Sequence, residues 1–382
     1  MTTRSARLSP PPALRAPQPK RAKRSGGRGT RIGALLPVGV GQVALWELAI
    51  VAVAATVLPW TLTSIVVAAV AIVVIAVTSV RWSGLCAYQW VGVHWRFRGS
   101  PSLRRGSDPI NAVLPDLRLR RQIDRAGNRA GLAESGDSLS AVVRLVPTAN
   151  PDPEALLRVL NRAFARTDIR LAGAQLVVWS VPSPPRARYY GDRRDFEPVQ
   201  VHWLALRFRT AESPAATLAR GGGATGAARA TATAALSLAG QLAEAGYGGV
   251  VLDEPELRQE LLVALGSDHA ALGGKVETTV QETWHDWSIG TLRQLTYQPR
   301  RAADGRLVLS RYVPQAAFTC ASYSLRRAAH GRLRGDSIIR IGVHPTSRMP
   351  KPNELSRMLG LELLPRNGRQ AESVLDNLPL AR

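Results

Sequence analysis

The sequence predicts a two-helix transmembrane hairpin followed by a mixed α/β cytosolic domain. Three observations predict this fold class. The long apolar runs lie before residue 81. Basic side chains gather on both sides of those runs. After them, amphipathic helical patterns alternate with short apolar runs of the kind that form strands.

The charge distribution indicates a membrane-adjacent region. The chain has 50 Lys and Arg against 28 Asp and Glu, a net charge of +22. Residues 1–46 contribute +9 and residues 81–125 contribute +6, so +15 flanks the apolar runs, as is usual beside membranes. A nucleic-acid-binding protein would instead carry a basic face within a folded module, so we expect no nucleic-acid partner. The two cysteines form no disulfide framework, and no metal or cofactor is expected.

The hairpin is predicted from two apolar runs in close succession. Residues 61–80 carry no charge and, as a helix, would span about 30 Å, the thickness of a hydrocarbon core. Residues 38–58 are almost as apolar, and only Pro59 and Trp60 separate the two runs. A cleaved signal peptide is the alternative, but the first run is long and a second follows at once. The basic flanks predict a multi-pass inner-membrane protein with both termini and the large domain in the cytoplasm.

The hairpin contains candidate contacts to partner helices. Glu47 lies near mid-membrane, where a charge is costly and usually faces protein. It could contact a partner helix, hydrogen-bond toward Gln42 or Thr61 within the hairpin, or couple to protons, although one acid makes no relay. A row of small side chains in the second run permits close helix approach. This row consists of Ser64, Ala68 and Ala76.

The segment after the second run is a candidate lipid or partner contact. Aromatic rings are interleaved there with arginines, which suits the headgroup zone of a membrane. Packing of a continuing helix against the domain is the alternative. The candidate contact residues are Trp82, Tyr88, Trp90, Trp95, Arg96 and Arg98.

The chain is divided into five predicted regions. These are a basic, disordered tail (1–37), the hairpin (38–80), a juxtamembrane Arg/Trp segment and connector (81–137), the α/β domain (138–349) and a C-terminal extension (350–382). In the domain, strands are predicted at 139–146, 175–181, 199–209, 291–297, 317–325 and 337–343, and helices at 153–166, 227–245 and 254–265. Asp152 and Pro153 begin the first helix, and Asp253 with Glu256 forms a capping box on the third. No internal repeat is evident.

No residue pattern predicts a convincing active site. The Gly-rich stretch 220–226 lacks the Lys and Ser/Thr of a phosphate-binding loop, so it is interpreted as a flexible joint. Asp192 and Asp195 lie on either side of two arginines that would neutralise them. His285 and Asp286 are the most site-like pair, but neighbours on a strand point to opposite faces. Glu282, Trp284 and Trp287 around them are interpreted as a structural corner. A membrane-anchored glycosyltransferase-like enzyme using these residues is the alternative function.

The motifs, taken in order, resemble the EccE family of actinobacterial type VII (ESX) secretion systems. The resemblance covers residues 38–345 and rests on the order of its parts. These are two close apolar runs, RWSGLCAYQWVGVHWRFR, QLVVWSVPSP, VHWLALRFR, an Ala-rich helix after RGGG, LDEPELRQELLVALG and ETWHDWSIGTLRQLTY. It implies a non-enzymatic structural subunit of an inner-membrane protein-transport complex. The implied partners are EccB-, EccC- and EccD-like subunits and membrane lipids, and no catalytic residues are implied.

Overall fold

The computed structural model describes most of the chain after residue 39. The described residues are 40–56, 62–79, 81–82, 85–99, 103–124, 126–147, 151–166, 168–182, 198–267, 278–327, 333–344 and 346–382. The predicted tail (1–37) and the pair Asp192 and Asp195 lie outside them. The chain divides into two compact units, a first unit of residues 1–75 and a second unit of residues 76–382.

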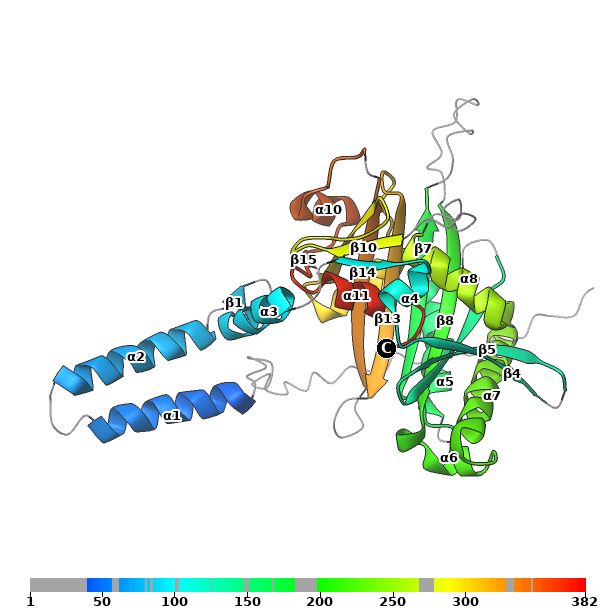
Figure 1. The fold of residues 1–382 in the computed structure, drawn as a ribbon, viewed down its shortest axis with the longest axis horizontal. Coiled ribbons are helices and arrows are strands. Elements are labelled where there is room, and N and C mark those ends of the chain that lie inside the picture. The colour runs from blue at the N-terminus through cyan, green and yellow to red at the C-terminus, as the bar shows by residue number, and fades with distance from the viewer. Residues whose placement is uncertain are drawn as a thin grey trace, which may run out of the picture. The chain divides into compact units, whose positions relative to one another are not determined.

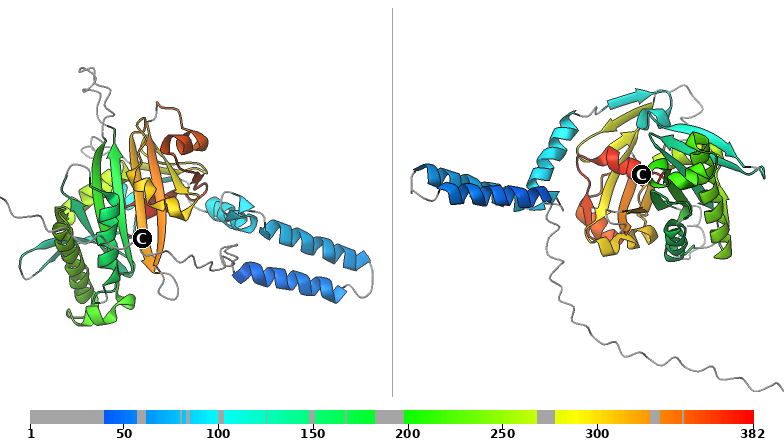
Figure 2. Two further views of the ribbon diagram at one scale, coloured as in Figure 1. Left: turned by 180° about the vertical axis from the view of Figure 1, so that it is seen from behind. Right: turned by 90° about the horizontal axis from the view of Figure 1, so that it is seen from below.

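The first unit contains two apolar helices. Helix α1 covers Val40–Thr56, and α2 begins in this unit and covers Leu62–Ser79. Both views in Figures 1 and 2 show them running antiparallel, side by side. Ala71 is buried, and Ala68 on the same face of α2 is partly buried, whereas most large apolar side chains of both helices are exposed.

The predicted transmembrane hairpin is wrong. Within the described ranges, no helix has both the length and the apolar character needed to cross a membrane. Helix α1 has 17 residues and α2 has 18. At 1.5 Å per residue these helices reach about 26 and 27 Å, which is less than a hydrocarbon core of roughly 30 Å.

The second unit is built on one 13-stranded sheet in which every strand pairing is antiparallel. The strands follow the order β3-β10-β11-β12-β14-β13-β7-β8-β6-β5-β4, with β15 beside β12 and β9 beside β6. They are β3 (Leu103–Gly106), β4 (Arg118–Ile123), β5 (Arg129–Ser135), β6 (Ser138–Leu145), β7 (Gly173–Val181), β8 (Val199–Arg209), β9 (Gly249–Val251), β10 (Thr278–Glu282), β11 (Trp287–Ile289), β12 (Leu292–Pro299), β13 (Phe318–Arg327), β14 (Leu333–Val343) and β15 (Leu363–Pro365).

The predicted mixed α/β class is also wrong, because of the position of one strand in the sheet. The sequence pattern of β6, the helix α5 (Pro153–Ala165) and β7 indicated a strand–helix–strand unit. The structure contains these three elements, but β8 enters between β6 and β7 and pairs antiparallel with both. The result is an antiparallel sheet with helices on its faces. The segment predicted as a connector supplies β3, β4 and β5 to that sheet.

The sheet contains an internal duplication. A first half-domain (residues 118–265) has the strand order β4-β5-β6-β8-β7, and a second half-domain (residues 278–377) repeats it as β10-β11-β12-β14-β13. In each, a short strand returns to pair with the third strand, β9 with β6 and β15 with β12. A helix follows in each case, α8 (Glu254–Leu265) or α11 (Gln370–Asn377). The halves meet where β7 pairs with β13.

Helices cover both faces of the sheet, and a separate core lies under each set (Figure 1). One core is formed with α5, α7 (Gly223–Glu244) and α10 (Pro352–Leu359). The other is formed with α4 (Pro109–Val113), α8 and α11. Alternating residues of the central strands supply the two cores, since side chains on a strand alternate between faces. Val142 enters one core and Val143 the other.

The predicted helix boundaries are confirmed where local capping defines them. The Asp152 carboxylate accepts hydrogen bonds from the amides of Glu154 and Ala155, with Pro153 as the first helical residue of α5. Asp253 and Glu256 form the capping box of α8. Gly266 ends α8 with a φ of 73°, a conformation that glycine adopts without steric cost.

Candidate functional site

The candidate site is formed where the helix α3 (Ala87–Gly99) contacts the sheet domain of the second unit. Three rings of α3 surround one indole, that of Trp284, in the turn before β11. The ring centroid of Trp284 lies 5.9 Å from Trp90, 5.5 Å from His94 and 5.3 Å from Phe97. His94 and Phe97 meet it edge-on, a favourable geometry for aromatic rings. Their spacing along α3 places all three rings on one helix face.

A hydrogen-bonded turn holds Trp284 in place. The Thr283 hydroxyl donates to Asp286 Oδ1 at 2.8 Å and accepts from the Asp286 amide at 3.0 Å. Arg293 Nε donates to the other carboxylate oxygen at 3.2 Å. Asp286 is only 4% exposed and His285 is exposed, so the two do not form an acid–base pair. The predicted structural corner therefore accounts for these residues.

Gly368 closes the remaining side of Trp284. A Cβ atom at this position would lie 2.5 Å from the indole, and the glycine has a φ of 69°. Its amide donates to the Trp284 carbonyl at 2.8 Å. Both the close approach and the backbone conformation require glycine. The segment that precedes α11 is thus fitted against the same indole that receives α3.

The N-terminus of α11 is capped from another strand. No side chain of its own N-cap residue bonds the helix, and Glu282 at the end of β10 instead accepts from the amide of Ala371 at 2.9 Å. A carboxylate at a helix N-terminus is stabilised by the helix dipole as well as by the hydrogen bond. Glu282 therefore joins β10 to α11 directly beneath α3.

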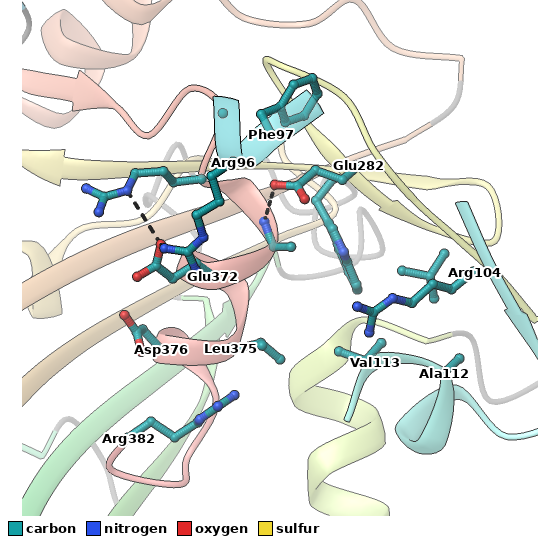
Figure 3. A pocket seen from close by; sticks show the side chains of 15 residues that line it. Arg96, Phe97, Arg104, Ala112, Val113, Glu282, Glu372, Leu375, Asp376 and Arg382 are labelled. Carbon is teal, nitrogen blue, oxygen red and sulfur yellow. Dashed lines mark hydrogen bonds and ion pairs between the residues drawn. The ribbon is translucent and has the colours of Figure 1, made fainter. Parts of the chain in front are cut away.

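A polar cavity of about 380 Å³ lies between α3, β10 and α11. Arg96 of α3 pairs with Glu372 of α11 at 3.6 Å, and Figure 3 shows Arg96 and Phe97 at its rim. Arg104 and Arg382 also line it, as does Asp376. Burial raises the pKa of Asp376, the largest effect on that carboxyl, while Arg326 lowers it. Arginines and acids both line this cavity. The Arg96–Glu372 ion pair therefore joins α3 to α11 in addition to the aromatic contact.

The structure separates the predicted contact residues into inward and outward groups. Trp90 faces Trp284, and Arg96 pairs with Glu372. Trp95 is 76% exposed on α3, and Arg98 is exposed as well. Glu47 is exposed on α1, and Ala68 is partly buried on α2. Ser64 and Ala76 lie in α2, Trp82 in β1 (Arg81–Trp82) and Tyr88 in α3, and the structure does not describe their side chains.

Two parts of the site were not predicted. Trp284 was interpreted only as a structural residue, and α11 lies in the predicted C-terminal extension. The aromatic residues of ETWHDW and of the segment that forms α3 were a usable signal, because aromatic rings pack favourably against one another. No local signal could place α11 beneath α3, because the two are far apart in sequence. Among the described residues, no group of His, Cys, Asp or Glu side chains could hold a metal ion.

These features define an antiparallel sheet domain that holds helix α3 on Trp284, the seat of that helix. Residues 199–298, from β8 almost to the end of β12, match the family model described as "Putative type VII ESX secretion system translocon, EccE". The resemblance to EccE predicted from the sequence is confirmed. This part of the chain is thereby similar to a family described as a component of the type VII secretion translocon. No curated protein matches the chain.

Proposed function

We propose that the chain is a structural, non-catalytic subunit of a type VII secretion complex at the inner membrane, with EccB-, EccC- and EccD-like partners. In this proposal, the apolar surfaces of α1 and α2 attach the chain to the complex, and the sheet domain lies on the cytoplasmic side. The match of residues 199–298 to the EccE translocon family is the observation that carries it.

Exposed apolar side chains on α1 and α2 support the attachment. These side chains are between 54% and 81% exposed, and soluble proteins rarely present so much contiguous apolar surface without a partner. Cover by apolar partner helices or by lipid would remove this surface from water. The residues concerned are Leu48, Ile50, Val51, Leu62, Ile65, Val66, Val70, Ile72 and Val73.

Helix α3 has two different faces, which supports a role as the joint of the subunit. The inward face is anchored by Trp90, Phe97 and the Arg96–Glu372 pair. The outward face presents Trp95 and Arg98, the combination that suits a headgroup zone or a polar partner rim. The seat on Trp284 would hold this outward face in a fixed orientation on the domain.

Co-purification tests the proposal. The tagged full chain should be extracted from cell membranes with a mild detergent and should bring with it EccB-, EccC- and EccD-like subunits. The double variant Leu48→Ser/Val51→Ser should reduce their recovery at least tenfold, because it breaks the apolar surface of α1. The matched control Leu218→Ser/Val250→Ser removes two exposed apolar side chains of the second unit and should change little. Recovery of the wild-type chain alone would contradict the proposal.

A further inference from the structure

The internal duplication makes the two edges of the sheet comparable. Strand β4 ends the sheet in the first half-domain, and β10 occupies the equivalent position in the second. The outer edge of β10 is covered, because β3 pairs with it antiparallel from Thr278 with Gly106 to Gln281 with Leu103. Within the described ranges, β4 pairs only with β5, so its outer edge has no strand beside it. Figure 1 shows β4 and β5 as a hairpin at the outside of the domain.

A surface hollow lies beside each of these edges in equivalent places. The cavity beside β10 is lined by α11 and by Arg104 of β3. The hollow beside β4, of about 400 Å³, is lined by Leu119 and Arg121 of β4 and by Pro255 and Arg258 of α8, the counterpart of α11. In the second half-domain, β3 of the same chain is the added strand beside β10, and its Arg104 lines the cavity. In the first half-domain, no strand among the described residues takes this place beside β4.

The charge of β4 specifies what could pair with it. Arg118, Arg120 and Arg121 lie within its six residues and are exposed. Arg120 contacts Glu134 of β5 at 3.1 Å. No ion pair joins Arg118 or Arg121 to an acid among the described residues. A second copy of β4 would set arginine against arginine, and like charges on facing strands are destabilising.

We propose that the free edge of β4 binds an extended acidic segment of a partner protein as an added antiparallel strand, in the way that β3 covers β10. Backbone hydrogen bonds along β4 would supply affinity, as in other strand additions. Alternate side chains of the segment fit the two environments of the edge. Acidic residues face Arg118 and Arg120, and aliphatic residues face Leu119 and the hollow beside it. This edge is separate from the α3 site, so either proposal can fail without the other.

Peptide binding to the full chain tests the proposal. The probe is a fluorescently labelled eight-residue peptide of alternating Glu and Val, and the readout is fluorescence anisotropy with amide hydrogen exchange of residues 118–123. We expect saturable binding that slows exchange in β4. The same peptide with its core backbone nitrogens methylated keeps its charge but cannot pair, and should bind at least tenfold more weakly. A peptide of alternating Lys and Val should not bind.

Variants of the chain locate the binding surface. Arg118→Gln/Arg120→Gln should weaken the Glu–Val peptide about tenfold, whereas Arg158→Gln/Arg334→Gln, which neutralises two exposed arginines elsewhere, should not. Equal binding of the methylated peptide would reduce the effect to charge attraction and overturn the proposal. Absence of binding, protection outside β4, or self-association of the chain through β4 would also overturn it.

Discussion

His202 shows how burial alone shifts the pKa of a side chain. Its side chain in β8 is 4% exposed, and its buried Nε2 atom has no hydrogen-bond partner among the described residues. Desolvation lowers the pKa of His202 to about 4 from 6.5. The unfolded chain therefore binds a proton between these pH values that the folded chain does not, and stability falls as the pH drops through that window.

The expected consequence is acid sensitivity that depends on His202. Lowering the pH from 7.5 to 5.0 should cost about 2 kcal/mol of unfolding free energy through this group. The variant His202→Leu should lose that part of the pH dependence in urea unfolding curves, whereas His344→Leu, at an exposed position, should keep it. An unchanged pH profile in His202→Leu would show that another group is responsible.

Arg340 is a buried cation held by neutral oxygens. Its guanidinium donates to Asn377 Oδ1 at 3.0 Å, to Gln294 Oε1 at 2.9 Å and to the carbonyl of Ala264. Burial lowers the pKa of Arg340 and raises that of the neighbouring Cys320 thiol. The planar fork of arginine satisfies three acceptors at once.

Removal of Arg340 should leave those acceptors buried and unpaired. Arg340→Leu is expected to destabilise the fold by about 3 kcal/mol or more, because unpaired buried polar groups are costly. Arg334→Leu on the same strand, where the side chain is 72% exposed, should change the unfolding free energy by less than about 0.5 kcal/mol. Chemical denaturation of both variants provides the measurement, and equal stabilities would refute the role assigned to Arg340.

At the scale of elements, α3 is bound to the domain by a small aromatic contact. Trp284 touches three rings of α3, and each aromatic contact contributes about 0.5–1.5 kcal/mol. Besides these rings, Arg96 pairs with Glu372 at 3.6 Å, and a solvent-exposed ion pair of this kind adds little. We therefore expect α3 to open locally without global unfolding.

Trp284→Ala should release α3 while the sheet remains folded. A loss of about 2 kcal/mol would speed amide exchange in residues 87–99 roughly thirtyfold. Trp95→Ala removes an indole of similar size from the outward face of the same helix and should leave exchange unchanged. If Trp284→Ala leaves α3 as protected as in the wild type, the seat on Trp284 is not what holds the helix.

At the scale of the whole molecule, the two half-domains stabilise each other's helices. Arg340 of the second half-domain donates to Ala264 at the end of α8, and Gln294 donates to Leu265 at 2.7 Å. In return, Gln175 of the first half-domain donates to Asp376 of α11 at 2.7 Å. Carbonyls at a helix C-terminus need such partners. Without the second half-domain, the carbonyls of Ala264 and Leu265 in α8 would lose these hydrogen bonds. Without the first half-domain, the carbonyl of Asp376 in α11 would lose its own.

Separate expression of the two parts tests this interdependence. Fragments 103–272 and 273–382 should each fail to unfold cooperatively alone, and co-expression should restore one cooperative transition. Circular dichroism and thermal unfolding of each fragment and of the mixture would show this. A fragment that folds alone with a transition like that of the full chain would mean that the shared contacts are dispensable.

Local chemistry in the sequence was sufficient for several individual strands and helices, although not for the fold class. It placed β8 and α8 at their observed ends and predicted the capping of α5 and α8, because strand alternation and capping depend on residues within a few positions. It also predicted the EccE resemblance and the aromatic segment that forms α3. Its prediction of a transmembrane hairpin was wrong, because no helix among the described residues is long and apolar enough to cross a membrane.

Contacts between distant segments were decided only by the tertiary structure. The insertion of β8 between β6 and β7 turned a predicted mixed α/β domain into an antiparallel sheet. The duplication of the half-domains became visible only through strand pairing, because equivalent strands share a position in the sheet without sharing a sequence motif. The fold class and the seat of α3 on Trp284 depend on pairings across long stretches of chain. Such pairings follow from which surfaces bury each other, and no local pattern encodes them.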